Sequence, residues 1–531
     1  MVKPSALDWN GRESQRQEKH ETRTPFIFFR FITFFVCKIE SNFEPDWKKK
    51  RAVAFLTFFP RLDIVSCTQS LSFDSKHCST LRKIIGTKIA ELSAQGRERM
   101  LTMFSKFILF VSFFFLAHQS VHAAPPAKLA GVSLTELGEY IYDAAQGDNQ
   151  KTEAQKRVDE LFQDGIRHIV LTPMAHMTNP RKSEITPNTP PAERPNERKR
   201  YLRLINYIHS KGMTVGMRPI FLVVDQNGNT PYIETLPNGK QKNWWHGNIQ
   251  PDSPNAWFES FKTYLDIYLP IANAGKVEQF TLSAELYSMT VGIEDQWAEN
   301  PHGFPGRWLS LLRYVKTKLP SSTQVMYDIN FTDDKVAGSA GGLGEFGGEF
   351  ARWRYRLVDL ANPSKPEEAA IWKDLVTFWK ELDAIGIDMY RSLATEGTRI
   401  SPDYNELVQT LKETTDRFAT QIDNGLFEIE NIVGAPKTII FKEVGFRSVE
   451  KGFVDPFLYV DAERGKVNLT HQMAAYDAMM QSFWKQDWPW FGGIVFWDAS
   501  INPEKHGPKD AGFSFLGKEP TEKLLKTYFI P

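Results

Sequence analysis

The sequence predicts an α/β protein, a (β/α)8 TIM barrel with long strand-to-helix loops. From residue 124 onward, eight short apolar runs alternate with eight amphipathic stretches of helical spacing. Most of the apolar runs are continuous, which is typical of parallel strands that are covered on both faces. Strands that alternate with helices predict a parallel sheet, and eight repeats favour its closure into a barrel.

The eight repeats can be placed along the chain by their apolar runs. We expect strands at residues 129–134, 168–174, 214–223, 279–286, 324–331, 384–390, 438–446 and 491–499. We expect helices at residues 152–164, 197–210, 256–272, 307–318, 371–383, 404–422, 469–485 and 519–528. Three long connections follow strands, at 178–196, 225–254 and 332–366; each is either a wall of the active face or an ordinary surface excursion.

The first 123 residues differ from the rest. A basic start, the apolar run 107–117 and small residues up to Ala123 predict a secretory signal peptide at 100–123. That run is shorter than the roughly 20 apolar residues of a membrane span. Residues 1–99 contain all three cysteines and no sustained period, so we expect a misassigned start or, alternatively, a separate N-terminal module. The predicted catalytic domain is 124–531, in a periplasm or outside the cell.

Charge and composition exclude some partners. The chain has 64 basic and 64 acidic residues and no basic stripe with interleaved aromatics, which argues against nucleic acid. We expect a mature form with no membrane span, no cofactor and no metal. The sequence leaves the oligomeric state open.

Two glutamates at strand ends are the candidate catalytic residues. Glu285 ends the fourth expected strand and Glu443 ends the seventh. Carboxylates at the C-terminal ends of barrel strands lie at the mouth, where one can protonate a glycosidic oxygen while the other, about 5 Å away, attacks the sugar. The pair therefore predicts a retaining glycoside hydrolase. Strand alternation predicts that Lys442 points away from Glu443.

From about residue 131 onward the chain resembles glycoside hydrolase family 113, the β-mannanase barrels. The resemblance is carried by the segments 245–251, 257–258, 385–390, 441–448, 493–497 and 517–518. It implies Glu285 as the acid/base, Glu443 as the nucleophile, Tyr390 as a hydrogen-bond donor to the nucleophile and Trp497 as the floor of a sugar subsite. Two residues depart from the pattern: Ala284 stands where an asparagine is usual, and His246 replaces an arginine.

Further residues are candidates for substrate binding. We expect sugar contacts from Tyr390, Trp497, His246 and the loop residues Trp244 and Trp245, whose rings can stack on a sugar. Arg218 is expected to bind a sugar hydroxyl or steady the nucleophile, with a structural ion pair as the alternative. Asp328, Asn330 and Asp388 end inner strands and are candidate hydrogen-bond donors or acceptors in the cleft, but for them we favour ordinary hydrogen bonding at strand ends.

The sequence does not support a dinucleotide site, a metal site or an esterase. The glycine-rich 342–347 matches a dinucleotide fingerprint by letters but does not directly follow a strand. His168 and His176 lack the spacing of a metal site. No Gly-x-Ser-x-Gly elbow supports an esterase.

The sequence thus predicts a secreted retaining hydrolase of β-linked, β-1,4-mannan-type polysaccharide. Two alternatives remain: a carbohydrate-binding barrel without catalysis, or the same mechanism on another β-glycan such as a cell-wall amino-sugar polymer.

Overall fold

The computed structural model describes residues 127–135, 151–228, 230, 232–293, 296–332, 348–458 and 465–530. The expected signal peptide at 100–123, the preceding segment 1–99 and the glycine-rich 342–347 lie outside the described residues.

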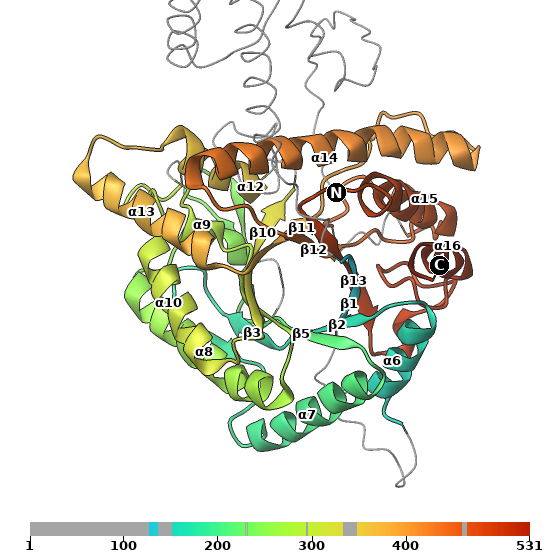
Figure 1. Ribbon diagram of the computed structural model, residues 1–531, viewed down its shortest axis with the longest axis horizontal. Coiled ribbons are helices and arrows are strands. Elements are labelled where there is room, and N and C mark those ends of the chain that lie inside the picture. The colour runs from blue at the N-terminus through green and yellow to red at the C-terminus, as the bar shows by residue number, and fades with distance from the viewer. Residues whose placement is uncertain are drawn as a thin grey trace, which may run out of the picture. The chain divides into compact units, whose positions relative to one another are not determined.

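Eight parallel strands close into a barrel, so the predicted fold class is confirmed. Figure 1 shows the ring of strands with helices around its outside. In chain order the barrel strands are β1 (Leu129–Thr135), β2 (His168–Leu171), β5 (Thr214–Met217), β9 (Gln279–Ala284), β10 (Gln324–Phe331), β11 (Ala384–Met389), β12 (Ile439–Val444) and β13 (Phe491–Ser500). Each expected strand is present, and β13 pairs with β1 to complete the ring.

Several of the outer helices begin at a residue whose side chain caps the first turn. The outer helices are α6 (Glu153–Gln163), α7 (Arg194–Ser210), α8 (Pro254–Gly275), α10 (Pro305–Lys318), α13 (Pro366–Glu381), α14 (Tyr404–Val433), α15 (Leu469–Met479), continued by the π-helix η5 (Met480–Trp484), and α16 (Glu519–Phe529). Thr152 forms a capping box before α6, and Asp403 caps α14. Helix α14 outruns its expected range because buried residues continue to Val433, where Gly434 ends it at φ 71°. Among the described helices, none is long and apolar enough to span a bilayer.

Two expected strands are interrupted at prolines. Proline has no backbone N–H to donate to a ladder, and β2 and β5 end shortly before Pro173 and Pro219. The chain then resumes as β3 (Met174–Met177) and β6 (Ile220–Val223), which pair in parallel beyond the barrel, with β4 (Thr186–Pro187) beside β3. The expected continuous strands 168–174 and 214–223 are therefore each corrected to two.

The connections between barrel strands and outer helices contain several short elements. The second long connection contains the hairpin β7 (Tyr232–Thr235) and β8 (Gln241–Trp244) and the 3-10 turn η1 (His246–Asn248). Helix α9 (Tyr287–Thr290) follows β9, helix α12 (Gly348–Arg354) and the π-helix η3 (Tyr355–Asp359) follow β10, and the 3-10 turn η6 (Pro503–Lys505) follows β13.

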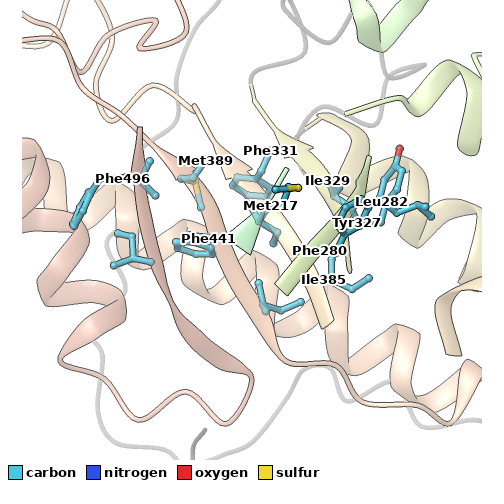
Figure 2. Packing of buried hydrophobic residues seen from close by; sticks show 14 of the residues in the cluster. Met217, Phe280, Leu282, Tyr327, Ile329, Phe331, Ile385, Met389, Phe441 and Phe496 are labelled. Carbon is cyan, nitrogen blue, oxygen red and sulfur yellow. The ribbon is translucent and has the colours of Figure 1, made fainter. Parts of the chain in front are cut away.

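The strands separate an apolar layer outside the barrel from a mixed interior. Alternate residues such as Phe280, Ile329 and Phe441 belong to the main hydrophobic core, part of which Figure 2 shows. A small apolar cluster of residues from different strands forms a layer of its own: Val170, Met326, Ala384, Ile440 and Val495. The same strands also carry buried polar side chains, which build the site described below.

Strand β12 contains a bulge at Lys442. Phe441 pairs with Ile387 and Glu443 pairs with Asp388, so Lys442 is an extra residue on this strand. The Lys442 side chain is fully buried, and its Nζ lies 3.3 Å from Gln279 Oε1 on β9. The expectation that Lys442 points away from the site is therefore wrong, because the bulge breaks the two-residue alternation.

Gly386 on β11 makes room for the interior charges. A Cβ at this position would lie 2.0 Å from Asp328 Oδ1 and 2.6 Å from Lys442 Cγ. We expect Gly386→Ala to lower the free energy of unfolding by about 1–3 kcal/mol through overpacking, measured by urea denaturation. Gly397→Ala is the control, because its Cβ would meet only Thr395 Oγ1 at 4.0 Å. Equal stability of the two variants would contradict this packing.

Candidate active site

Arg218 is the centre of a buried ion-pair network at the C-terminal ends of the strands. It directly follows β5 and is 1% exposed. Its Nε donates to Asp328 Oδ2 and its Nη2 to Asp388 Oδ2, both at 2.7 Å, while Nη1 donates to Glu443 Oε1. The planar guanidinium thus joins carboxylates from three neighbouring strands, β10, β11 and β12.

The surrounding charges respond to burial in opposite directions. Burial raises the pKa of Asp388 well above its usual value and that of Asp328 to a lesser degree, while Arg218 opposes both shifts. Burial lowers the pKa of Lys442 to about 8, against the pull of the nearby carboxylates. Arg218 keeps its charge, since its carboxylate partners outweigh its desolvation and raise its pKa.

Glu443 is held at both carboxylate oxygens. Arg218 donates to Oε1, and Tyr390 Oη donates to Oε2 at 2.7 Å. Burial raises the pKa of Glu443, and the charge of Glu285 raises it further, whereas Arg218 and Tyr390 oppose this rise. Arg218 also lowers the pKa of Glu285, so the two carboxyl groups lie in the field of the same cation.

Glu285 leaves strand β9 in the left-handed region, with φ 56°. This conformation is uncommon for a residue with a side chain and recurs at functional sites. Its backbone N–H donates to the carbonyl of Asp328 at 2.9 Å. Its carboxylate accepts from Asn330 Nδ2 at 2.6 Å and pairs with His246 Nε2 at 3.0 Å. Burial alone would raise the pKa of Glu285, but His246, Asn330 and Arg218 outweigh it and lower the pKa.

Aromatic rings fix the position of His246. The ring of Trp245 meets it edge-on with centroids 4.8 Å apart, and the ring of Phe221 does so at 6.1 Å. Gly247 is required next to them, because a Cβ there would lie 2.6 Å from the indole of Trp245. His246 thus occupies a defined place beside Glu285.

Trp497 lies in a separate aromatic cluster with Tyr390 and Phe513. It is 8% exposed and lies in the C-terminal half of β13. The Trp497–Asp498 peptide bond that follows it is cis. Tyr390 meets Phe513 edge-on with centroids 6.5 Å apart. The cluster is continuous with Glu443 through Tyr390.

The structure corrects the expectation for Trp244. Its ring is fully buried at the end of β8, and its Nε1 donates to Glu234 Oε2 at 2.7 Å. The cations of Arg181 and Lys242 lie 4.9 Å and 3.6 Å from its ring. A ring enclosed in this way has no free face for a sugar, whereas Trp245 remains partly exposed.

Asp328, Asn330 and Asp388 have a larger part in the site than the favoured interpretation of the sequence gives them. They bind Arg218 and Glu285 directly rather than only satisfying strand ends. Their signal was present, because polar residues two apart at the end of a buried strand face the same side. Lys442 was hidden by the bulge.

Comparison with known proteins gives one family. The sequence model of Glycoside Hydrolase Family 113 matches residues 139–327 and 366–518, more than half of the chain. No curated protein matches the chain.

Solved structures with a similar fold include three glycosidases. A β-mannanase of the same family from Alicyclobacillus acidocaldarius has a TM-score of 0.46 and 18% identity, over 76% of this chain and 97% of that one. A β-1,4-mannanase of the family has a TM-score of 0.45 and 18% identity, over 76% and 99%. An endo-laminarinase from Formosa has a TM-score of 0.40 and 14% identity, over 74% and 84%.

The ion-pair network predicts a strong, pH-dependent effect of Arg218→Met. Removing the cation leaves three buried carboxylates without their partner, which should cost about 3–5 kcal/mol of stability at pH 7. The loss should shrink as the pH falls, because protonation of these carboxyl groups removes the uncompensated charge. Urea denaturation at pH 5 and pH 7 measures both effects, with Arg218→Lys as a partial rescue. A deficit that does not depend on pH would contradict the network.

Proposed function

From the premise that the chain belongs to Glycoside Hydrolase Family 113, we propose that it is a retaining glycoside hydrolase of β-1,4-mannan-type polysaccharide. The observation that supports this best is the pairing of two carboxyl groups with unlike partners at the mouth of the barrel. Glu443 is bound by an arginine and a tyrosine, which keep their protons, and Glu285 is bound by a histidine.

Glu443 suits the nucleophile. Its oxygens accept from Arg218 and Tyr390, donors that both hold their protons at neutral pH, so these contacts stabilise the carboxylate form. A carboxylate oxygen fixed in this way can attack the anomeric carbon and form a glycosyl-enzyme. Glu443 loses its negative charge when that ester forms and regains it when the ester breaks, and Arg218 stabilises the charged form.

Glu285 suits the acid/base. Burial alone would raise its pKa, and the contact with His246 is the largest of the effects that lower it. A proton that Glu285 receives across the 3.0 Å contact with His246 makes it the acid that protonates the leaving oxygen. After departure of the leaving group, the same carboxylate removes a proton from water for the second displacement.

The substrate proposal rests on the resemblance to the β-mannanases of the family. The two departures from that pattern lie beside the acid/base. Ala284 cannot donate to a sugar hydroxyl, and His246 contacts Glu285. Another β-glycan therefore belongs in the same test.

The test is the product profile of residues 124–531 on a panel of β-mannan, β-glucan and amino-sugar polymers. We expect new reducing ends with mannan, and proton NMR should show that the first product keeps the β-configuration. Glu443→Ala should abolish turnover, a loss of about 10⁴-fold or more, while Glu285→Ala should slow mannan cleavage by about 10²–10⁴-fold. With an activated leaving group, Glu285→Ala should recover most of its rate, because that group needs no protonation.

Three results would contradict this proposal in whole or in part. Inverted product would reject the double displacement, and full activity of both variants would reject the assignment. Tight oligosaccharide binding without cleavage would favour a carbohydrate-binding barrel.

We also propose that the protein acts in a periplasm or outside the cell, on the basis of the signal-like segment 100–123. N-terminal sequencing of the exported protein should give a start at Ala124. Retention of the segment in the exported product would contradict this.

A further inference from the structure

Glu349 is a fully buried carboxyl group behind the proposed acid/base. It lies on α12, in the segment 328–365 that falls between the two ranges matched by the family model. Its Oε2 accepts from the backbone N–H of Asn330 at 3.2 Å, and its Oε1 accepts from Trp353 Nε1 at 3.0 Å. Oε1 also lies 3.0 Å from Tyr327 Oη.

The contact with Tyr327 is the first of three in a row. Tyr327 Oη lies 2.9 Å from Thr290 Oγ1, and Thr290 Oγ1 lies 2.9 Å from the carbonyl oxygen of Leu286. The chain of oxygens therefore runs from Glu349 to the residue that directly follows Glu285 in the sequence.

Counting protons along this chain distinguishes two states of Glu349. Each contact is closed by one proton, and a carbonyl oxygen can only accept. With an ionised Glu349, Tyr327 Oη donates to Oε1, and the two hydroxyl protons of Tyr327 and Thr290 close only two of the three contacts. With a protonated Glu349, Glu349 donates to Tyr327, Tyr327 donates to Thr290 and Thr290 donates to Leu286, so that all three contacts are closed.

The electrostatic surroundings agree with a protonated group. Burial raises the pKa of Glu349 to about 8, and the charge of Glu285 acts in the same direction. The titratable groups that face it from neighbouring elements are Tyr327 on β10, Tyr287 on α9 and Glu285 at the end of β9. Arg352, on its own helix, donates Nη1 to the carbonyl of Gly292 at 3.1 Å.

The contacts of Glu349 converge on Glu285 from two sides. Through Tyr327 and Thr290 it holds the backbone immediately after Glu285, and through the Asn330 N–H it holds the residue whose side chain donates to Glu285 Oε1. The same segment restrains the chain beyond α9, because Arg356 Nε donates to the carbonyl of Val291 at 2.9 Å. A displacement of about 1 Å in a catalytic group can cost about 10²-fold in rate.

We propose that Glu349 is a positioning residue that acts as a neutral carboxylic acid, whose proton closes a hydrogen-bond relay that fixes Glu285. The effect of Glu349 on catalysis rests on the proposed function, whereas the protonation state of Glu349 does not. Ionisation of Glu349 leaves one contact of the relay without a proton and places a second buried negative charge beside Glu285.

The experiment compares Glu349→Gln, Glu349→Ala and Tyr327→Phe with the unaltered protein. Glutamine mimics the neutral acid, since its amide donates to Tyr327 and its oxygen accepts from Asn330, although Trp353 then loses its acceptor. Alanine removes every contact. Phenylalanine at 327 breaks the relay and leaves the contacts of Glu349 to Asn330 and Trp353.

On the glycan that proves to be the substrate, we expect Glu349→Gln at pH 6 to keep kcat within about threefold of the unaltered protein. Glu349→Ala and Tyr327→Phe should lower kcat by about 10-fold or more with KM little changed, because they misplace Glu285. If Glu349→Gln loses as much activity as Glu349→Ala, the neutral-acid role is wrong.

The second readout needs no activity. A group whose folded-state pKa lies above its unfolded value stabilises the protein at low pH, and this contribution is lost as the pH rises through the folded value. Between pH 5 and pH 9, the unaltered protein should therefore lose more unfolding stability than Glu349→Gln. Over the same pH range, the infrared difference spectrum of the unaltered protein should show the loss of a carboxylic-acid C=O band. The spectrum of Glu349→Gln should lack this change.

These outcomes separate the two proposals. If no glycan is cleaved, the function fails, and the unfolding and infrared measurements still accept or reject the neutral acid. Identical pH dependence of the two proteins, with no acid band assigned to Glu349, would overturn the inference.

Discussion

The site depends on one buried cation, Arg218. Three carboxylates from successive strands would repel one another at this depth, and no single ion pair would compensate their desolvation. A guanidinium offers donors in a fixed plane, so one side chain can serve Asp328, Asp388 and Glu443 together. The arrangement also ties the third barrel strand to the fifth, sixth and seventh. Geometry at the mouth and cohesion of the barrel are therefore consequences of the same interaction.

The two carboxyl groups of the site differ because their partners differ. Glu443 contacts an arginine and a tyrosine, which offer protons without exchanging them readily, and Glu285 contacts a histidine, which can give and take one. Nothing in the glutamate side chain itself distinguishes the two. The difference arises from which strand end each occupies and from the loop that brings His246 to one of them only.

Much of this was predictable from the sequence, and what was not has definite physical causes. The eight strands and their helices follow from apolar periodicity, and the two glutamates follow from their place at strand ends. Lys442 was misjudged because a bulge is a property of the pairing between strands, which the alternation along one strand does not reveal. Trp244 was misjudged because its loop folds into a hairpin that encloses the ring. The role of Glu349 depends on its contacts with Tyr327 and Asn330 on strand β10, and no local pattern encodes those.

Residues 328–365, between the two family-matched ranges, contribute to both carboxyl groups of the site. Asp328 accepts from Arg218, which also holds Glu443, and Asn330 donates to Glu285. Exchange of this segment between related barrels would therefore alter the surroundings of the attacking oxygen and of the proton donor together.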